Sequence, residues 1–356
     1  MKGAWIRING STTSRSVHGR SDFAAVCVLL ICTEGSRVNL KQMYHRMMHA
    51  RTVRHQLKEY GARFEKYAYV DCQCTDREQF RASITRLYHT IEKGLAYIDF
   101  RPGFGKENIE QLLQSLHQYA EHGYDCTAEF YGAALSCLEA YISKNKAHGL
   151  DLKELEARIA QLPGASNGLG GVIEIQAPVE PEKMNFKELM SSRHSIRHFS
   201  AQRVDSDALA DAVRTAQYTP SACNRQGWKT RIIQDKNTVA GILANQNGNK
   251  GFGNEIDQLI IITADLRAQQ RNREVFQAYI DGGMYAANIL NALHYKGIGS
   301  VPLSAALTSE QERNVRQLLA MDDAEVLILI IGVGNYPPGS ILTTRSERRF
   351  EPIQTC

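Results

Sequence analysis

The second half of the chain alternates apolar strand-like runs with amphipathic helices, and this alternation limits its possible folds more than any other feature. Runs rich in Ile, Val and Leu occupy residues 229–234, 259–264, 298–303 and 326–333. Helical spacing marks residues 205–218, 238–245, 268–296 and 309–319. Helices interleaved with strands cover both faces of a sheet. We therefore expect an α+β fold, an α/β sandwich with a mixed sheet flanked by helices.

The longest expected helix, residues 268–296, carries apolar residues around most of its circumference, so we expect it to be buried. Gly282 and Gly283 lie in its middle, where glycine costs about 1 kcal/mol relative to alanine. Close approach of another backbone would compensate that cost. One candidate for the approaching backbone is the same helix of a second subunit.

The first half of the chain is helical by pattern. Residues 76–94 place apolar side chains three and four apart, and residues 109–120, 128–148 and 152–162 continue the pattern. An all-α domain over residues 39–162 is expected. The Pro/Gly-rich stretch 163–183 is then a linker, and the second domain spans 184–356. Residues 1–38, rich in Ser, Thr, Gly and Arg, are expected to form a disordered leader.

Composition excludes several classes of protein. No apolar run approaches the roughly 20 residues that span a bilayer, so no membrane span is expected. Eight cysteines without a recurring metal spacing indicate a reducing, cytoplasmic compartment and no metal site. Residues 1–66 carry 12 Lys and Arg against 4 Asp and Glu, yet few aromatic residues and no recognised nucleic-acid motif. No nucleic-acid partner is therefore expected.

A basic heptapeptide follows a short helical segment at residues 186–192. Its sequence is Arg193-His194-Ser195-Ile196-Arg197-His198-Phe199. In helical geometry Arg193 and Arg197 would share a face, and an arginine fork matches phosphate oxygens bidentately. Ser195 adds a neutral donor and His194 a ring edge. The segment suits a phosphate-bearing cofactor, although a basic, solvated helix end would have the same composition.

A polar loop, residues 220–228, links the helix at 205–218 to the first strand. It reads Pro220-Ser221-Ala222-Cys223-Asn224-Arg225-Gln226-Gly227-Trp228. Its side-chain amides suit the carbonyls and ring nitrogens of a flat heterocycle. Together the two motifs resemble those of the FMN-dependent nitroreductase family, Arg-(Arg/His)-Ser-x-(Lys/Arg) and Pro-Ser-x-x-Asn-x-Gln-Pro-Trp. Gly227 in place of proline is the departure in the second motif, and it removes no ligand.

The resemblance covers residues 185–350 and implies which residues hold FMN. The family's phosphate and ribityl contacts fall on Arg193, His194, Ser195 and Arg197, with Arg345 or Arg348 completing the phosphate clamp. Pro220, Ser221, Ala222 and Asn224, with Gln226 nearby, would reach the flavin of a partner subunit. The segment that passes the ring edge would be Pro302, Leu303 and Ser304. Family members are homodimers with both flavin sites at the interface, and their long central helix forms much of that interface.

The resemblance implies an FMN-dependent oxidoreductase. NADH or NADPH would reduce flavin N5, and a small organic molecule would then accept, or supply, electrons by ping-pong hydride transfer. The flavin carries the chemistry, so no catalytic residue is assigned. Two alternatives stay open: a non-catalytic flavin-binding or interaction protein, and a flavin-dependent tailoring oxidase on the same fold. A polar cluster at residues 88–95 and 101–105 would either close over the flavin site, bind a partner, or be a helix end followed by a turn.

Overall fold

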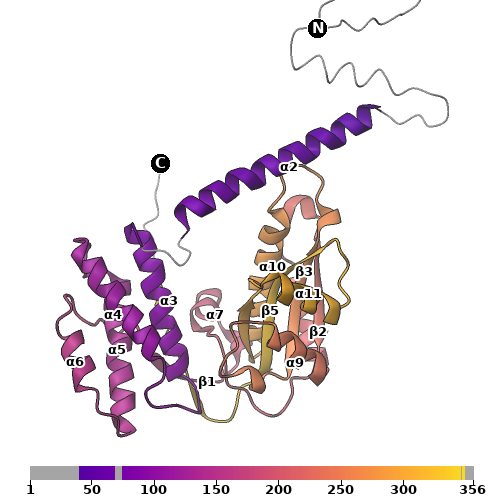
Figure 1. Cartoon of the computed structure of the whole chain (residues 1–356). Helices are drawn as coiled ribbons and strands as arrows, with labels where there is room; N and C mark the ends of the chain where they lie inside the picture. The colour runs from indigo at the N-terminus through magenta and orange to yellow at the C-terminus, as the bar shows by residue number, and fades with distance from the viewer. Residues whose placement is uncertain (1–39, 69–73, 346, 349–356) are drawn as a thin grey trace, which may run out of the picture. The chain divides into compact units, whose positions relative to one another are not determined.

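The computed structural model describes residues 40–68, 74–345 and 347–348 (Figure 1). The chain divides into two compact units, residues 1–61 and 62–356, and helix α2 (Leu40–Tyr67) runs across the division. The expected disordered leader, residues 1–38, lies outside the described residues. None of the helices in the described part of the chain is long and apolar enough to cross a bilayer.

Helices continue through the first part of the second unit. They are α3 (Arg77–Leu95), α4 (Lys106–Glu121), α5 (Glu129–Ala147) and α6 (Lys153–Ile159). Asp76 caps α3, because its carboxylate accepts the backbone N–H of Gln79 at 3.0 Å. The apolar faces of α3, α4 and α5 meet in one core that includes Leu87, Leu116 and Tyr131. The predicted helical half is therefore confirmed as helical.

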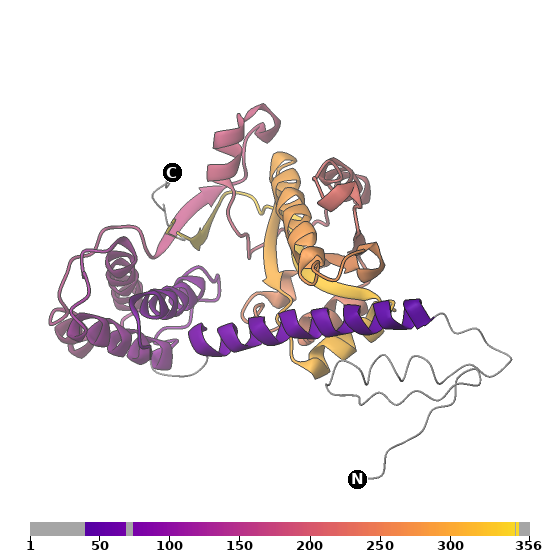
Figure 2. The ribbon, with the colours of Figure 1, turned by 90° about the horizontal axis from the view of Figure 1, so that it is seen from above.

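Part of the segment expected to be a linker, residues 163–183, packs closely against α5. A Cβ on Gly170 would lie 1.9 Å from the carbonyl oxygen of Ala133, so only glycine fits there. Strand β1 (Val172–Gln176) follows and pairs antiparallel with β6 (Ser340–Thr344), far away in the sequence (Figure 2). The predicted domain boundaries stay a prediction, but this stretch holds structure of its own.

The C-terminal half contains a four-stranded sheet in the order β2-β3-β5-β4. Its strands are β2 (Trp228–Ile233), β3 (Gln258–Asp265), β4 (Ile298–Ser304) and β5 (Glu325–Asn335). All four expected strands are thereby confirmed. The expected mixture of strand directions is not seen, because every pairing in the described sheet is antiparallel.

Helices cover both faces of this sheet. The α-helices are α7 (Phe186–Ser192), α8 (Ser206–Ala216), α9 (Lys236–Ala244), α10 (Gln277–Tyr295) and α11 (Ser309–Leu318). Short 3₁₀ turns lie at Pro181–Lys183, Ala222–Asn224, Gly253–Glu255 and Leu266–Ala268. In β3, Leu259 and Ile261 pack with α9 and α11, whereas Ile260 and Ile262 pack with α8 and α10. The three-layer sandwich that alternation predicts is confirmed.

Helix α10 differs from its prediction in two ways. It begins at Gln277 rather than at residue 268, because the polar run 269–274 has no apolar face to bury. It is also only half buried, since Tyr279, Ile280 and Met284 are exposed along one side. Gly282 meets Ile328 of β5, 2.8 Å from where a Cβ would lie, so the close approach at this glycine is within one chain. Gly283 faces open space.

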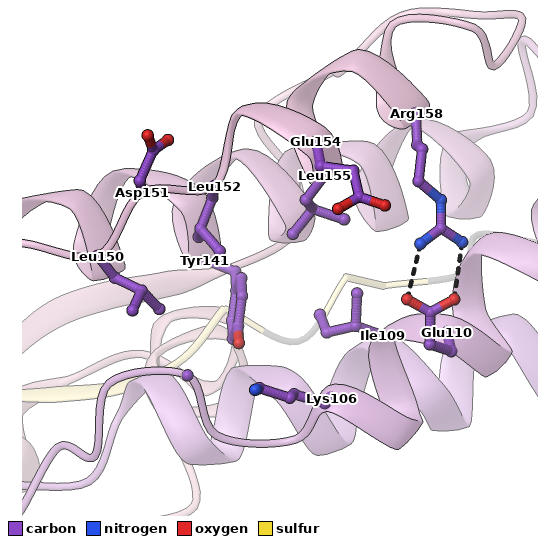
Figure 3. Close-up of a pocket in the computed structure, with 11 residues that line it drawn as sticks. Lys106, Ile109, Glu110, Tyr141, Leu150, Asp151, Leu152, Glu154, Leu155 and Arg158 are labelled. Carbon is purple, nitrogen blue, oxygen red and sulfur yellow. Dashed lines mark hydrogen bonds and ion pairs between the residues drawn. The ribbon is translucent and has the colours of Figure 1, made fainter.

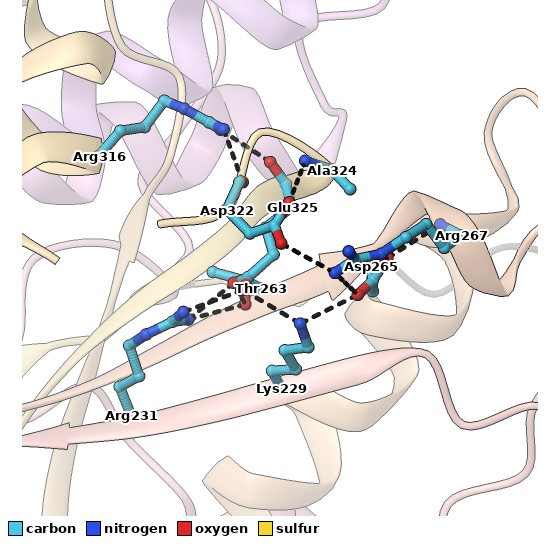
Figure 4. A network of polar contacts seen from close by, with 9 residues as sticks. All are labelled: Lys229, Arg231, Thr263, Asp265, Arg267, Arg316, Asp322, Ala324 and Glu325. Carbon is cyan, nitrogen blue, oxygen red and sulfur yellow. Dashed lines mark hydrogen bonds and ion pairs between the residues drawn. The ribbon is translucent and has the colours of Figure 1, made fainter. Parts of the chain in front are cut away.

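A buried carboxylate ties three strands together at one end of the sheet (Figure 4). Glu325 on β5 receives a two-pronged contact from Arg231 on β2, at 2.8 and 3.0 Å. Thr263 on β3 and Lys229 on β2 also donate to it, at 2.7 and 3.1 Å. These donors lower the pKa of Glu325 to about 2, with the Arg231 hydrogen bonds contributing most. The negative charge of Glu325 is thus stabilised by contacts that exist only in the folded chain.

We expect Glu325→Gln to lower the free energy of unfolding at pH 7 by about 1–3 kcal/mol, because two cations lose their shared acceptor. The folded pKa lies below the ordinary value of 4.5, so the wild-type advantage is complete above that value and fades as pH falls toward 2. Urea unfolding at several pH values between 7 and 2 measures this difference in the free energy of unfolding. Asp323→Asn, at a fully exposed side chain, is the control. An unfolding difference that is equal at pH 7 and pH 3 would contradict the assignment.

Candidate functional site

The basic heptapeptide is extended rather than helical. A capping box between Asn185 and Glu188 starts α7, but the helix ends at Ser192, and Arg193 has φ −68° and ψ 125°. The backbone N–H of Ile196 donates to the carbonyl of Ser300 at 2.9 Å, and Ile196 is fully buried. The shared helical face expected for Arg193 and Arg197 is therefore wrong, because burial of Ile196 holds this run against β4.

One guanidinium nitrogen of Arg193 is buried without a hydrogen-bond partner. Its Nη1 has no hydrogen-bond acceptor, and its side chain forms no ion pair within residues 74–345 and 347–348. Burial lowers the pKa of Arg193, and the nearby charge of Arg348 lowers it further. Two cations close together around an unsatisfied buried donor form a place suited to an anion.

Two histidines lie beside this arginine. The Nδ1 of His194 is 2.8 Å from the carbonyl oxygen of Ser192, which can only accept, so Nδ1 carries the proton. His294, in the last turn of α10, has its Nε2 2.8 Å from the hydroxyl of Ser192. Burial and the charge of Arg193 lower the pKa of His294 to about 4. Burial also lowers the pKa of His194, so both rings are neutral at pH 7.

The structure distinguishes between the two C-terminal arginines. The charge of Arg348 reaches Arg193 and His194, as their lowered pKa values show. Arg345 instead uses its backbone N–H to donate to Gly171 at 2.9 Å, extending the β1–β6 pairing. Of the two, Arg348 is the arginine whose charge acts on Arg193 and His194. Tyr336, which sequence reasoning missed, also lies in the electrostatic surroundings of Arg193.

Arg197 does not share the surroundings of Arg193. Its guanidinium carbon lies 6.0 Å from the centre of the Phe252 ring. Its only hydrogen bonds in the described structure are long, at 3.4 Å to Thr344 and 3.5 Å to the Ser195 carbonyl. The hydroxyl of Ser195 makes no hydrogen bond among the described residues, and its carbonyl accepts from Thr343 at 2.9 Å.

The polar loop has an unusual backbone. Cys223, Asn224 and Gln226 all have positive φ, at 53°, 55° and 48°, which residues other than glycine adopt only when neighbouring contacts enforce it. Within the loop, the hydroxyl of Ser221 accepts the N–H of Gln226 at 2.9 Å, and the side chain of Gln226 donates to that of Asn224 at 3.0 Å. The loop is therefore rigid although Asn224 and Gln226 are exposed.

Helix α10 and its approach hold the loop in place. The buried carboxylate of Asp281 accepts the N–H of Ala222 at 3.3 Å. Asn288 donates to Thr219 at 2.7 Å, directly before Pro220. Arg225 pairs with Glu274 at 2.7 Å. The loop thus presents its amide side chains to solvent next to the exposed side of α10.

Two further motif positions have structural explanations. A Cβ on Gly227 would lie 2.8 Å from the side chain of Ala268, which excludes a larger residue there. Trp228 stacks on Tyr285 with ring centres 4.6 Å apart, so it supports the sheet and α10.

Along β4, Leu303 is buried in the core, whereas Pro302 is half-buried and Ser304 exposed. Leu303 could therefore offer a ligand only its backbone.

A pocket in the helical half holds none of the predicted site residues (Figure 3). Apolar side chains such as Ile109 and Leu155 line it beside Tyr141. Its Arg158 and Glu110 neutralise each other through two hydrogen bonds of 2.7 Å. Neither of these two charges is therefore available to a ligand, and we assign the pocket no function.

Fold and site together define an α+β domain with the basic side chains of Arg193 and Arg348 at one corner and a loop of side-chain amides held by its own hydrogen bonds. The Nitroreductase family model matches residues 190–245 and 243–335. An Archaeoglobus fulgidus protein provisionally named NADH dehydrogenase/NAD(P)H nitroreductase is 24% identical over 168 residues, 46% of this chain and 92% of the relative. The C-terminal half of the chain therefore contains a nitroreductase-family domain, preceded by a helical region.

Two further similar proteins were found. A provisionally named NAD(P)H nitroreductase of Streptococcus pyogenes is 43% identical over 53 residues, 15% of this chain and 26% of the relative. The crystal structure of a provisionally named nitroreductase of Desulfovibrio desulfuricans, in complex with FMN, is 19% identical. It covers 48% of this chain and 94% of that one, with a TM-score of 0.40.

We expect Arg193→Met to leave the flavin-free protein as stable as wild type, or more stable by about 1–2 kcal/mol. The change removes a half-buried cation whose Nη1 has no hydrogen-bond partner and which the charge of Arg348 repels. Arg225→Met is the matched control, because it strands Glu274 and should cost about 1–3 kcal/mol. Urea unfolding of both flavin-free variants is the measurement. Equal destabilisation would mean that Arg193 is a structural residue.

Proposed function

We propose that this chain is an FMN-dependent oxidoreductase that takes electrons from NADH or NADPH and passes them to a small organic molecule. One observation carries the proposal: the buried, unsatisfied Nη1 of Arg193 lies where the charge of Arg348 is also felt. A phosphate there would accept from the unpaired Nη1 of Arg193 and would be attracted by the charge of Arg348 as well. The names of the relatives, and the FMN in one of their structures, support the same ligand.

Arg193 and Arg348, with the hydroxyl of Ser195, would hold the phosphate of FMN. His194 is neutral without a ligand, and an anion beside its free Nε2 would favour the protonated, donating ring. Arg197 would lie along the remainder of the cofactor. Bound FMN supplies the two-electron chemistry, accepting hydride from NAD(P)H and passing it to the acceptor.

The rest of the site orients the ring and excludes water. Asn224 and Gln226 offer amide groups for the ring carbonyls and nitrogens, and the enforced backbone of their loop fixes these donors before a ligand arrives. Pro302 and Ser304 would pass the ring edge. Because the chemistry belongs to the cofactor, the chain needs no acid or base of its own for hydride transfer.

The proposal is tested by comparing FMN with riboflavin, which lacks only the phosphate. We expect Arg193→Met to weaken FMN binding by about 10- to 100-fold and to leave riboflavin binding unchanged, because a charge-assisted hydrogen bond is lost. Fluorescence titration of the flavin-free protein measures both affinities. Lys153→Met, which removes an exposed lysine of the helical half, serves as control. Equal weakening of the two flavins would contradict a phosphate contact at Arg193.

We further propose a homodimer in which the loop of one subunit completes the flavin site of the other. The exposed apolar side of α10, including Tyr279, Ile280 and Met284, lies next to this loop. Exposed apolar side chains that recur along one helix are typical of a protein–protein contact. Pro220, Ser221, Ala222 and Asn224 would reach the neighbouring flavin across that contact.

Gly283→Leu separates dimer formation from folding. A side chain at Gly283 meets nothing within 4 Å in a single chain, and leucine favours helix over glycine. Across a close helix contact it would overpack, at a typical cost of about 1–3 kcal/mol. We therefore expect a folded variant that loses dimer and flavin together on dilution. Light scattering with flavin absorbance measures this, and the exposed Gln317→Leu on α11 is the control. A monomer that keeps stoichiometric FMN would contradict the shared site.

A further inference from the structure

The end of helix α3 lies against the C-terminal half, next to Arg197. The ring of Tyr97 covers the backbone at Gly251, where a Cβ would be only 2.5 Å from it. Its hydroxyl donates to the carbonyl of Lys250 at 2.5 Å, and its ring centre is 6.4 Å from that of Phe252. Phe252 is the ring over which Arg197 lies. A residue of the helical half is thus fixed beside a predicted cofactor residue.

Several cationic side chains lie around Tyr97. Lys93, one turn earlier on α3, is partly buried, and its pKa is lowered by burial and by the charge of Arg197. Burial raises the pKa of Tyr97, against the opposing charges of Arg197 and Arg101. We call Lys93, Tyr97, Arg101 and Arg197 the Arg197 cluster. Lys93 and Arg101 belong to the polar cluster that the sequence singled out at residues 88–95 and 101–105, whereas Tyr97 lies between its two parts.

The Arg197 cluster has no ion-paired carboxylate among the described residues. The charge of Glu92 is felt at Arg197, but its two carboxylate oxygens already accept the N–H of Gly171 at 2.9 Å and contact the ring of His89 at 3.0 Å. In the described parts of the chain, no carboxylate lies within 4.0 Å of Lys93, Arg101 or Arg197. Like charges held together away from water raise the free energy of the unliganded state, and an anion would lower it.

We propose that Lys93, Tyr97 and Arg197 form a subsite for an anionic group, a carboxylate or a phosphate, on a molecule bound at the cofactor site. The helical half would then select ligands by charge, with the ammonium and guanidinium pairing with the anion and the hydroxyl positioned beside it. The proposal rests on the proposed function for the identity of the neighbouring site. Arg193 and Arg348 already supply cations for the cofactor phosphate, which favours a group on the substrate.

The test uses the FMN-loaded full chain and two ligands that differ in charge, 4-nitrobenzoate and the neutral 4-nitrobenzyl alcohol. Equilibrium dialysis on the oxidised protein gives their affinities without turnover. We expect wild type to prefer the anion. Lys93→Met should weaken its binding by about 10-fold and leave the alcohol unaffected. Lys93→Arg should retain the preference, and Lys153→Met, which removes an exposed lysine, should match wild type.

A second measurement tells whose anion is bound. If Lys93→Met instead lowers the affinity for FMN but not for riboflavin, the group is the phosphate of the cofactor. If Lys93→Met changes the affinity for neither pair of ligands by more than Lys153→Met does, the subsite does not exist. Tyr97→Phe, which removes only the hydroxyl, repeats the test should Lys93→Met fail to fold. A protein that binds no FMN would overturn the proposed function, while calorimetry with inorganic phosphate on the same protein still decides the subsite.

Discussion

The pairing of β1 with β6 is the contact on which the candidate site depends. It joins residues 172–176 to residues 340–344 and so returns the C-terminal segment to the basic heptapeptide. Thr343 then donates to the carbonyl of Ser195, and Thr344 accepts from Arg197. Beyond β6, Glu347 accepts the hydroxyl of Tyr88 on α3 at 3.1 Å. One two-stranded ribbon therefore connects the basic heptapeptide, the segment at residues 340–348 and helix α3.

Much of the C-terminal half was predictable because its strands are local and strongly apolar. Each of the four expected runs became a strand of the central sheet. The signal is clearest for β3, where burial on both faces leaves a continuous apolar run in the sequence. The rigid loop at residues 220–226 was predicted as a loop from its turn formers. Its positive φ values were not, because contacts such as Asp281 to Ala222 enforce them from a distant helix.

The rest could not be predicted for physical reasons that differ from residue to residue. Strands β1 and β6 are five residues each and stabilise each other only across a long stretch of chain. The extended course of Arg193 to Arg197 follows from burying Ile196, which a helical pattern does not reveal. His294 reads as an ordinary residue at a helix end, and only the fold brings it beside Arg193. Lys93 and Tyr97 likewise acquire their neighbours through the docking of α3.

The helical half changes how the nitroreductase-family domain is to be understood in this chain. Its α5 packs against the glycines of the expected linker, and its α3 reaches the residues around Arg197. If the helical half preceded the nitroreductase-family domain without contacting it, Glu92, Tyr88 and Tyr97 would have hydrogen-bond partners only within the helical half. Instead all three contact residues that follow residue 163, as the hydrogen bonds to Gly171, Glu347 and Lys250 show.

The central claim is that the chain is a flavin-dependent oxidoreductase and not only a flavin-binding protein. Anaerobic titration of the FMN-loaded protein with NADH, and separately with NADPH, tests it most directly through the visible absorbance of the flavin. Our account predicts that at least one nucleotide bleaches the flavin completely at one equivalent per site, and that a nitroaromatic acceptor restores the colour. A protein that retains stoichiometric FMN, yet is bleached by neither nucleotide, would contradict the account.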